Sequence, residues 1–139
     1  MTSALYVGQK ASFSRTVSET DIVQYAGLSG DFNPIHMDKE YATKTRFRER
    51  IAHGLLTSCN ISRMLGMHLP GPGSVYVNQS LQFVKPVYIG DTITTTAEIL
   101  EIKQDKGIVR LKTECHQQDG KLVLEGEATM LIPSEGELR

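Results

Sequence analysis

The sequence lacks tryptophan, has only two cysteines and carries almost no net charge. Its 15 basic residues nearly balance 16 acidic ones, for a formal net charge of −1, so the overall charge does not favour binding to nucleic acid or to an anionic membrane. No apolar run approaches the roughly 18 residues that a membrane-spanning helix needs. The N-terminus also lacks the basic start and apolar stretch of a secretory signal.

A chain of 139 residues with 40% hydrophobic and 22% charged residues has the composition of one globular domain. It is too short for a cofactor domain plus a substrate domain. We expect a single domain over residues 1–139, with its core at about 7–133 and a frayed polar tail at 134–139. Cys59 and Cys115 are expected to be free thiols, which predicts a cytoplasmic protein, or one of an organelle matrix if a presequence was removed.

Helix signals dominate the first half of the chain. Residues 7–17 alternate weakly and predict a strand, after which Ser18 begins a capping-box pattern and Gly30 marks a helix end. Asp38 is a second cap, for a short helix that ends near Thr43. Residues 54–65 hold one charge and have apolar residues on more than one side, which predicts a helix buried along most of its length.

Strand signals dominate the second half, after a Pro-Gly break at 70–73. β-branched residues, alternation and a strong Asp-Gly hairpin signal predict four strands in an antiparallel meander, at residues 75–84, 92–104, 108–118 and 121–132. A sheet that curls around the single apolar helix covers both apolar surfaces. The sequence therefore predicts an α+β fold.

An acid and an imidazole flank an Asn-Pro turn in residues 30–36. Pro34 has a fixed φ and biases Asn33 away from helix, so the turn can direct Asp31 and His36 into one cleft. An Asp/His pair can hold a water and move protons to and from it, which is general acid–base chemistry. The alternative is that the acid and the amide only cap the turn and that the histidine is a surface residue.

The dipeptide His53-Gly54 opens the apolar helix. A helix N-terminus has unpaired backbone N–H groups and a partial positive charge, and Gly54 has no side chain to keep a ligand oxygen away from its N–H. These properties suit an oxyanion hole for an enolate or a thioester carbonyl. The alternative is that Gly54 serves close packing or capping.

Taken together, these segments resemble a known family. Residues 30–36, Asp38, Tyr41-Ala42 and Ala52-His53-Gly54 resemble the hydratase motif of the MaoC-like hot-dog proteins, and the likeness runs from about residue 7 to 133. Within that family the chain resembles short, single-domain (R)-specific enoyl-CoA hydratases. The resemblance implies a hot-dog fold, an antiparallel β-sheet wrapped around a long central α-helix.

The resemblance also implies a reaction and its residues. Asp31 and His36 match the family's catalytic pair, Asn33 matches a supporting polar residue, and Gly54 matches the backbone donor to the thioester oxygen. The implied reaction is reversible syn hydration of trans-2-enoyl-CoA to (R)-3-hydroxyacyl-CoA, in fatty-acid or polyhydroxyalkanoate metabolism. It uses no metal or redox cofactor, since coenzyme A is part of the substrate.

Other positions are assigned less directly. Ser62, Leu65 and Met130 match residues that line the acyl pocket in related hydratases, although Met and Leu fill ordinary cores equally well. His53, Cys59 and His68 do not have a recognised zinc spacing, so each is interpreted as a structural or exposed residue.

Several alternatives remain open. The first is a 3-hydroxyacyl-acyl-carrier-protein dehydratase of fatty-acid synthesis, which runs the same chemistry on another carrier. A hot-dog thioesterase is disfavoured because residues 54–65 contain no Asp or Glu. A non-catalytic thioester-binding module would be favoured by loss of Asp31 or His36, and both are present. The fold leaves a sheet edge to be covered, and the family resemblance implies a homodimer.

Overall fold

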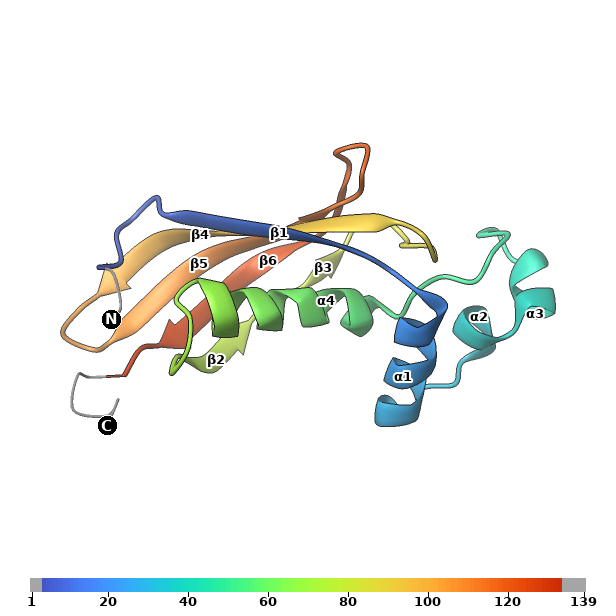
Figure 1. Ribbon diagram of the computed structural model, residues 1–139, viewed down its shortest axis with the longest axis horizontal. Helices are drawn as coiled ribbons and strands as arrows, with labels where there is room; N and C mark the ends of the chain where they lie inside the picture. The colour runs from blue at the N-terminus through green and yellow to red at the C-terminus, as the bar shows by residue number, and fades with distance from the viewer. Residues whose placement is uncertain (1–3, 134–139) are drawn as a thin grey trace.

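The computed structural model describes residues 4–133 and shows a six-stranded antiparallel sheet with one long helix lying along it (Figure 1). The expected frayed tail at 134–139 lies outside the described residues. In chain order the elements are β1 (Lys10–Thr16), α1 (Glu19–Ser29), α2 (Pro34–Met37), α3 (Lys39–Thr43), α4 (Gly54–Arg63), η1 (Met64–His68), β2 (Val75–Gln79), β3 (Gln82–Phe83), β4 (Thr92–Lys103), β5 (Ile108–His116) and β6 (Leu122–Leu131). The expected α+β class is confirmed.

The strand order across the sheet is β1-β4-β5-β6-β2, with β3 also paired to β6. Strands β4, β5 and β6 form the expected meander, but β2 and β3 lie beside β6 rather than beside β4. The prediction of one four-strand meander is therefore wrong at its first strand. Short turns fix β4, β5 and β6 as neighbours, and β2 and β3 pair with the edge of β6 that this leaves free.

The predicted strand at 75–84 is also interrupted. Between β2 and β3, Ser80 donates its backbone N–H to the Glu127 carbonyl oxygen at 2.9 Å and passes directly over Gly126. A Cβ built on Gly126 would lie 1.8 Å from the Ser80 carbonyl oxygen, so this crossing requires glycine. The break depends on a residue 46 positions later in the chain, which local sequence patterns cannot show.

The core lies between the sheet and α4. In β4 the side chains that alternate inward, from Ile93 to Ile99, are buried, and Leu111 of β5 and Leu124 of β6 extend the same apolar layer. Helix α4 places Thr57 and Ile61 against this layer. None of the helices in residues 4–133 has both the length and the apolar character that crossing a membrane requires.

Helix α4 is less enclosed than its sequence predicts. Leu55, Cys59 and Ser62 are exposed, because within one chain the sheet covers only one side of the helix. The expectation that this helix is buried along most of its length is therefore wrong. The helical course also continues past the predicted end at Leu65, through the π-helical turn η1 to His68. Both cysteines are free, as expected.

Helix α1 leads the chain to the candidate site, and its ends follow the sequence signals. Ser18 Oγ accepts the Asp21 N–H at 3.1 Å while an Asp21 carboxylate oxygen accepts the Ser18 N–H at 2.9 Å, which is the expected capping box. Gly30 ends the helix with φ +82°, a left-handed conformation that favours glycine. Arg15 pairs with Asp21 at 2.5 Å and fixes the helix start to β1.

Candidate active site

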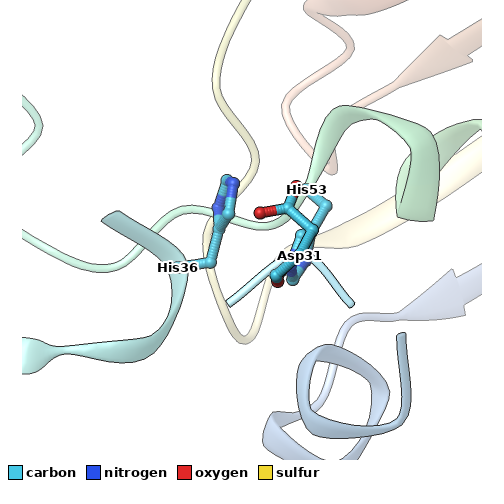
Figure 2. Close-up of side chains that lie close together, drawn as sticks. All are labelled: Asp31, His36 and His53. Atoms are coloured by element: carbon cyan, nitrogen blue, oxygen red, sulfur yellow. The ribbon is translucent and has the colours of Figure 1, made fainter. Parts of the chain in front are cut away.

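The turn that follows α1 is built by its own polar side chains. The Asp31 N–H donates to Ser29 Oγ, and one Asp31 carboxylate oxygen accepts the Asn33 N–H, both at 3.1 Å. Asn33 in turn accepts the Ile35 N–H at 3.2 Å and caps α2, which begins at Pro34. The expectation that the acid and the amide cap the turn is therefore correct for the local structure. The Asp31 carboxylate points toward His36 (Figure 2).

His36 lies on α2, a short helix that the sequence pattern does not predict. Its Nδ1 lies 2.7 Å from the Ile51 carbonyl oxygen. A carbonyl oxygen only accepts, so Nδ1 carries the proton and Nε2 keeps a lone pair. Arg50 donates to the His36 carbonyl oxygen at 2.5 Å and holds the backbone of the same turn. Both contacts join α2 to the segment that leads into α4.

Burial lowers the pKa of the His36 imidazole below the ordinary histidine value of 6.5. The hydrogen bond to the Ile51 carbonyl oxygen opposes this shift, and the neighbouring His53 ring adds to it. A depressed pKa keeps the ring neutral near neutral pH, with its lone pair on Nε2 free to accept a proton. His36 therefore has the protonation state of a general base.

The third group beside this pair is His53, which was expected to be a structural or exposed residue. Its ring is buried, lies 4.0 Å from the His36 ring centroid to centroid, and has Nε2 2.9 Å from the Asp31 carbonyl oxygen. Figure 2 shows the three side chains converging from separate segments. The sequence holds one indication that His53 belongs to the site. His53 directly precedes Gly54, so it lies beside any ligand bound at the N-terminal end of the helix.

Gly54 is the first residue of α4, so its N–H has no acceptor within the helix. A Cβ at this position would lie 2.6 Å from the Phe83 ring. The packing interpretation of Gly54 therefore has direct support in the structure. This packing role is compatible with a second role for Gly54 as oxyanion donor, because the lack of a side chain also leaves its N–H open to a ligand.

A carboxylate oxygen of Asp31 and one ring nitrogen each of His36 and His53 lie within 4.8 Å of one another. Such groups bind zinc and other transition metals. However, His53 Nε2 is hydrogen-bonded to the Asp31 carbonyl oxygen, and His53 Nδ1 is enclosed with no hydrogen-bond partner among residues 4–133. The trio thus offers a metal only two open ligand atoms, fewer than the three protein ligands typical of catalytic zinc.

Comparison with known proteins identifies the family. Residues 3–119 match the MaoC like domain. The chain belongs to the MaoC-like domain family. It is 50% identical to an (R)-specific enoyl-CoA hydratase of Rhodospirillum rubrum, over 93% of this chain and 89% of that protein. It is 41% identical to a mitochondrial 3-hydroxyacyl-[acyl-carrier-protein] dehydratase of Arabidopsis thaliana, over 94% of this chain and 79% of that one.

A solved structure supports the same assignment. The (R)-hydratase of A. caviae, described as involved in PHA biosynthesis, superposes with a TM-score of 0.91 at 42% identity, covering 94% of this chain and 98% of that one. The MaoC-like resemblance and the hot-dog fold expected from the sequence are thereby confirmed.

In this MaoC-like chain the three expected acyl-pocket residues lie in different surroundings. Ser62 lines a groove of about 360 Å³ between α4 and β2, together with Cys59 and Tyr76. Leu65 and Met130 are instead fully enclosed in the hydrophobic core. Neither residue lines the groove, so a pocket that reaches them stays a prediction.

Proposed function

We propose that this chain catalyses the reversible syn addition of water to trans-2-enoyl-CoA, giving (R)-3-hydroxyacyl-CoA. The observation that carries the proposal is the meeting of the Asp31 carboxylate and the His36 ring, within 4.8 Å, at the N-terminal end of α4. The named activity of the R. rubrum relative supports the same reaction and substrate class.

The spacing of the pair suits a shared water. Hydrogen bonds to water are about 2.8 Å long, so one molecule reaches two acceptors up to roughly 5 Å apart. A water held by Asp31 and by His36 Nε2 loses a proton to the pair as its oxygen attacks C3 of the enoyl group. The pair then returns a proton to C2 on the same face, which makes the addition syn. Either residue can take the first proton, since coupled groups titrate jointly.

The thioester oxygen needs a donor, because attack at C3 places negative charge on it. The Gly54 N–H, at the positive end of the α4 dipole, is suited to this task. Asn33 supports the pair indirectly, through its hydrogen bonds to Asp31 and to the backbone of α2. In this proposal no metal and no cofactor takes part, and the coenzyme A portion belongs to the substrate.

We further propose that the chain acts as a homodimer. Strand β2 is an edge strand, and its side chains Val75, Tyr76 and Val77 are exposed. A second copy paired to this edge would extend the sheet and add a wall to the groove that contains Ser62. Light scattering at micromolar concentration should give the mass of two chains, and a monomer would contradict the proposal.

The carrier of the acyl group is the finer question. We propose coenzyme A, with acyl carrier protein as the second candidate because the A. thaliana relative is named a dehydratase of that substrate. We also propose a cytoplasmic location, supported by the two free cysteines.

The test is the hydration of crotonyl-CoA and of longer enoyl-CoAs, followed by the loss of ultraviolet absorbance of the conjugated thioester. The proposal predicts turnover and an (R) product. Turnover only of enoyl thioesters of acyl carrier protein would support the dehydratase instead. Folded protein that hydrates neither carrier at any chain length would favour a non-catalytic thioester-binding module.

A further inference from the structure

We propose that His53 is a positioning residue. It fixes the positions of the Asp31 loop, the His36 ring and the start of α4 relative to one another, as the reaction requires. The inference rests on the proposed function. His53 touches neither the water nor the reacting carbons in this account, and it acts through the two groups that do. Two contacts of its ring and its peptide bond to Gly54 support this role.

The first contact fixes the loop that carries Asp31. His53 Nε2 lies 2.9 Å from the Asp31 carbonyl oxygen, 22 residues earlier in the chain. Within residues 4–133, the other hydrogen bonds of Asp31 are to Ser29 and Asn33, which lie in the same exposed turn and move with it. The bond from His53 therefore anchors this turn to the body of the protein. An exposed turn without such an anchor samples many positions.

This contact also defines the tautomer of His53. The carbonyl oxygen only accepts, so Nε2 carries a proton. Nδ1 is buried and has no hydrogen-bond partner in the part of the chain that the structure describes, so a proton there would leave an unsatisfied N–H. The hydrogen bond thus selects the tautomer that carries its proton on Nε2. A residue in this state is suited to donate one fixed hydrogen bond and is unsuited to proton transfer.

The second contact supports the base. The His36 and His53 rings are stacked, with centroids 4.0 Å apart and planes inclined by 29°. Tyr25 of α1 contacts His53 in turn, at 4.6 Å between ring centroids. His36 is therefore held at one edge by the Ile51 carbonyl oxygen and on one face by His53. These two contacts leave the His36 ring little freedom to rotate.

The third contact is covalent. His53 is the N-cap residue of α4 and is bonded to Gly54, the proposed oxyanion donor. One buried side chain, 2% exposed, thereby relates the acid, the base and the oxyanion donor to one another. A displacement of about 1 Å in such a constellation costs roughly 10²-fold in rate. We expect the loss of this side chain to lower kcat without weakening substrate binding.

The test compares His53→Leu, which keeps apolar volume but has no donor, with His53→Gln, whose amide N–H reaches the position of Nε2. His53→Leu should lower kcat by about 10²-fold with KM little changed. His53→Gln should restore most of kcat, because it restores the bond to the Asp31 carbonyl oxygen. The matched control is His68→Leu, which removes a histidine stacked on Phe13 away from the site and should leave kcat unchanged.

Equal kcat in His53→Leu and wild type, or equal losses in the Leu and Gln variants, would overturn the inference. Nitrogen NMR of the wild-type protein provides a readout without any activity or variant. It should show one slowly exchanging proton on His53 Nε2 and none on Nδ1, and a proton on Nδ1 would overturn the inference. Failure of the wild type to hydrate any enoyl thioester would instead refute the proposed function, with the NMR result still deciding whether His53 anchors the loop.

Discussion

The two ends of α4 differ in almost every physical property. At the N-terminal end, polar groups from three segments converge, and the turn that carries Asp31 is exposed. At the C-terminal end, Met64 and Leu65 are fully buried against the sheet, and the helix widens into the π-helical turn η1. Only ten residues of regular helix separate the two regions.

The difference shows how one helix serves both chemistry and stability. Unpaired N–H groups and the positive end of the dipole make the first turn suitable for a developing oxyanion. The last turn has neither unpaired N–H groups nor a positive dipole end, so it is not suited to bind an anion. Its side chains stabilise the fold by burying apolar surface instead. Substitutions at the first end should therefore change rates, and substitutions at the second should change the free energy of unfolding.

The largest effect is expected at the acid–base pair. Asp31→Asn and His36→Gln keep the size of each side chain and remove its ability to exchange a proton with water. Each should lower kcat by about 10²–10⁴-fold, while thermal unfolding stays close to that of the wild type because the turn at Asp31 is exposed. Crotonyl-CoA hydration measures kcat of each variant, and a melting curve measures its thermal stability. Retention of full activity in either variant would remove that residue from the catalytic pair.

The next effect concerns Gly54, for which packing and catalysis make different predictions. Gly54→Ala should lower kcat by about 10²–10³-fold if the side chain keeps the thioester oxygen from the N–H. The added Cβ would also meet the Phe83 ring at 2.6 Å. The double variant Gly54→Ala/Phe83→Ala relieves that overlap. It should regain stability but not activity, and recovery of activity would show that glycine is needed there only for packing.

At the other end of α4 the expected effect is on stability. Leu65 is fully buried, so Leu65→Ala should lower the free energy of unfolding by about 2–5 kcal/mol, measured by urea denaturation. The folded variant should hydrate crotonyl-CoA at nearly the wild-type rate. A loss of activity without a loss of stability would contradict the division between the two ends and would place Leu65 in the acyl pocket.

The smallest effect is a shift in a pH profile. His36 must be neutral to accept a proton, and burial lowers its pKa below the ordinary value of 6.5. As pH falls, kcat/KM should therefore stay high through the range in which an ordinary histidine is protonated and should decline only below it. The pH profile of crotonyl-CoA hydration measures this limb. A decline that begins well above pH 6.5 would show that His36 is not the neutral base assumed.

Much of the fold was predictable because its signals are local. The capping box at Ser18, the left-handed Gly30 and the cap at Asp38 each act within a few residues, and all three are found as expected. The hairpin turn at Asp119-Gly120 joins β5 and β6 as predicted. The convergence of Asp31 and His36 was also expected, since five residues and one Asn-Pro turn determine it.

The errors arise where distant segments decide the structure. The break at Ser80 depends on Gly126 of another strand, and the position of β2 depends on which edge of β6 is free. The importance of His53 could not be inferred from its spacing, because its partner is the Asp31 carbonyl oxygen and not a side chain. Every residue has the same backbone carbonyl group, so the sequence does not show which carbonyl oxygen a side chain will bind.

The central claim is that Asp31 and His36 act on one face of the substrate through a shared water. Hydration of crotonyl-CoA in deuterium oxide tests it most directly, because the label at C2 records the face from which the proton arrives. The account predicts deuterium on the same face as the new hydroxyl group of an (R)-3-hydroxybutyryl product. Deuterium on the opposite face, or an even mixture of the two, would contradict it.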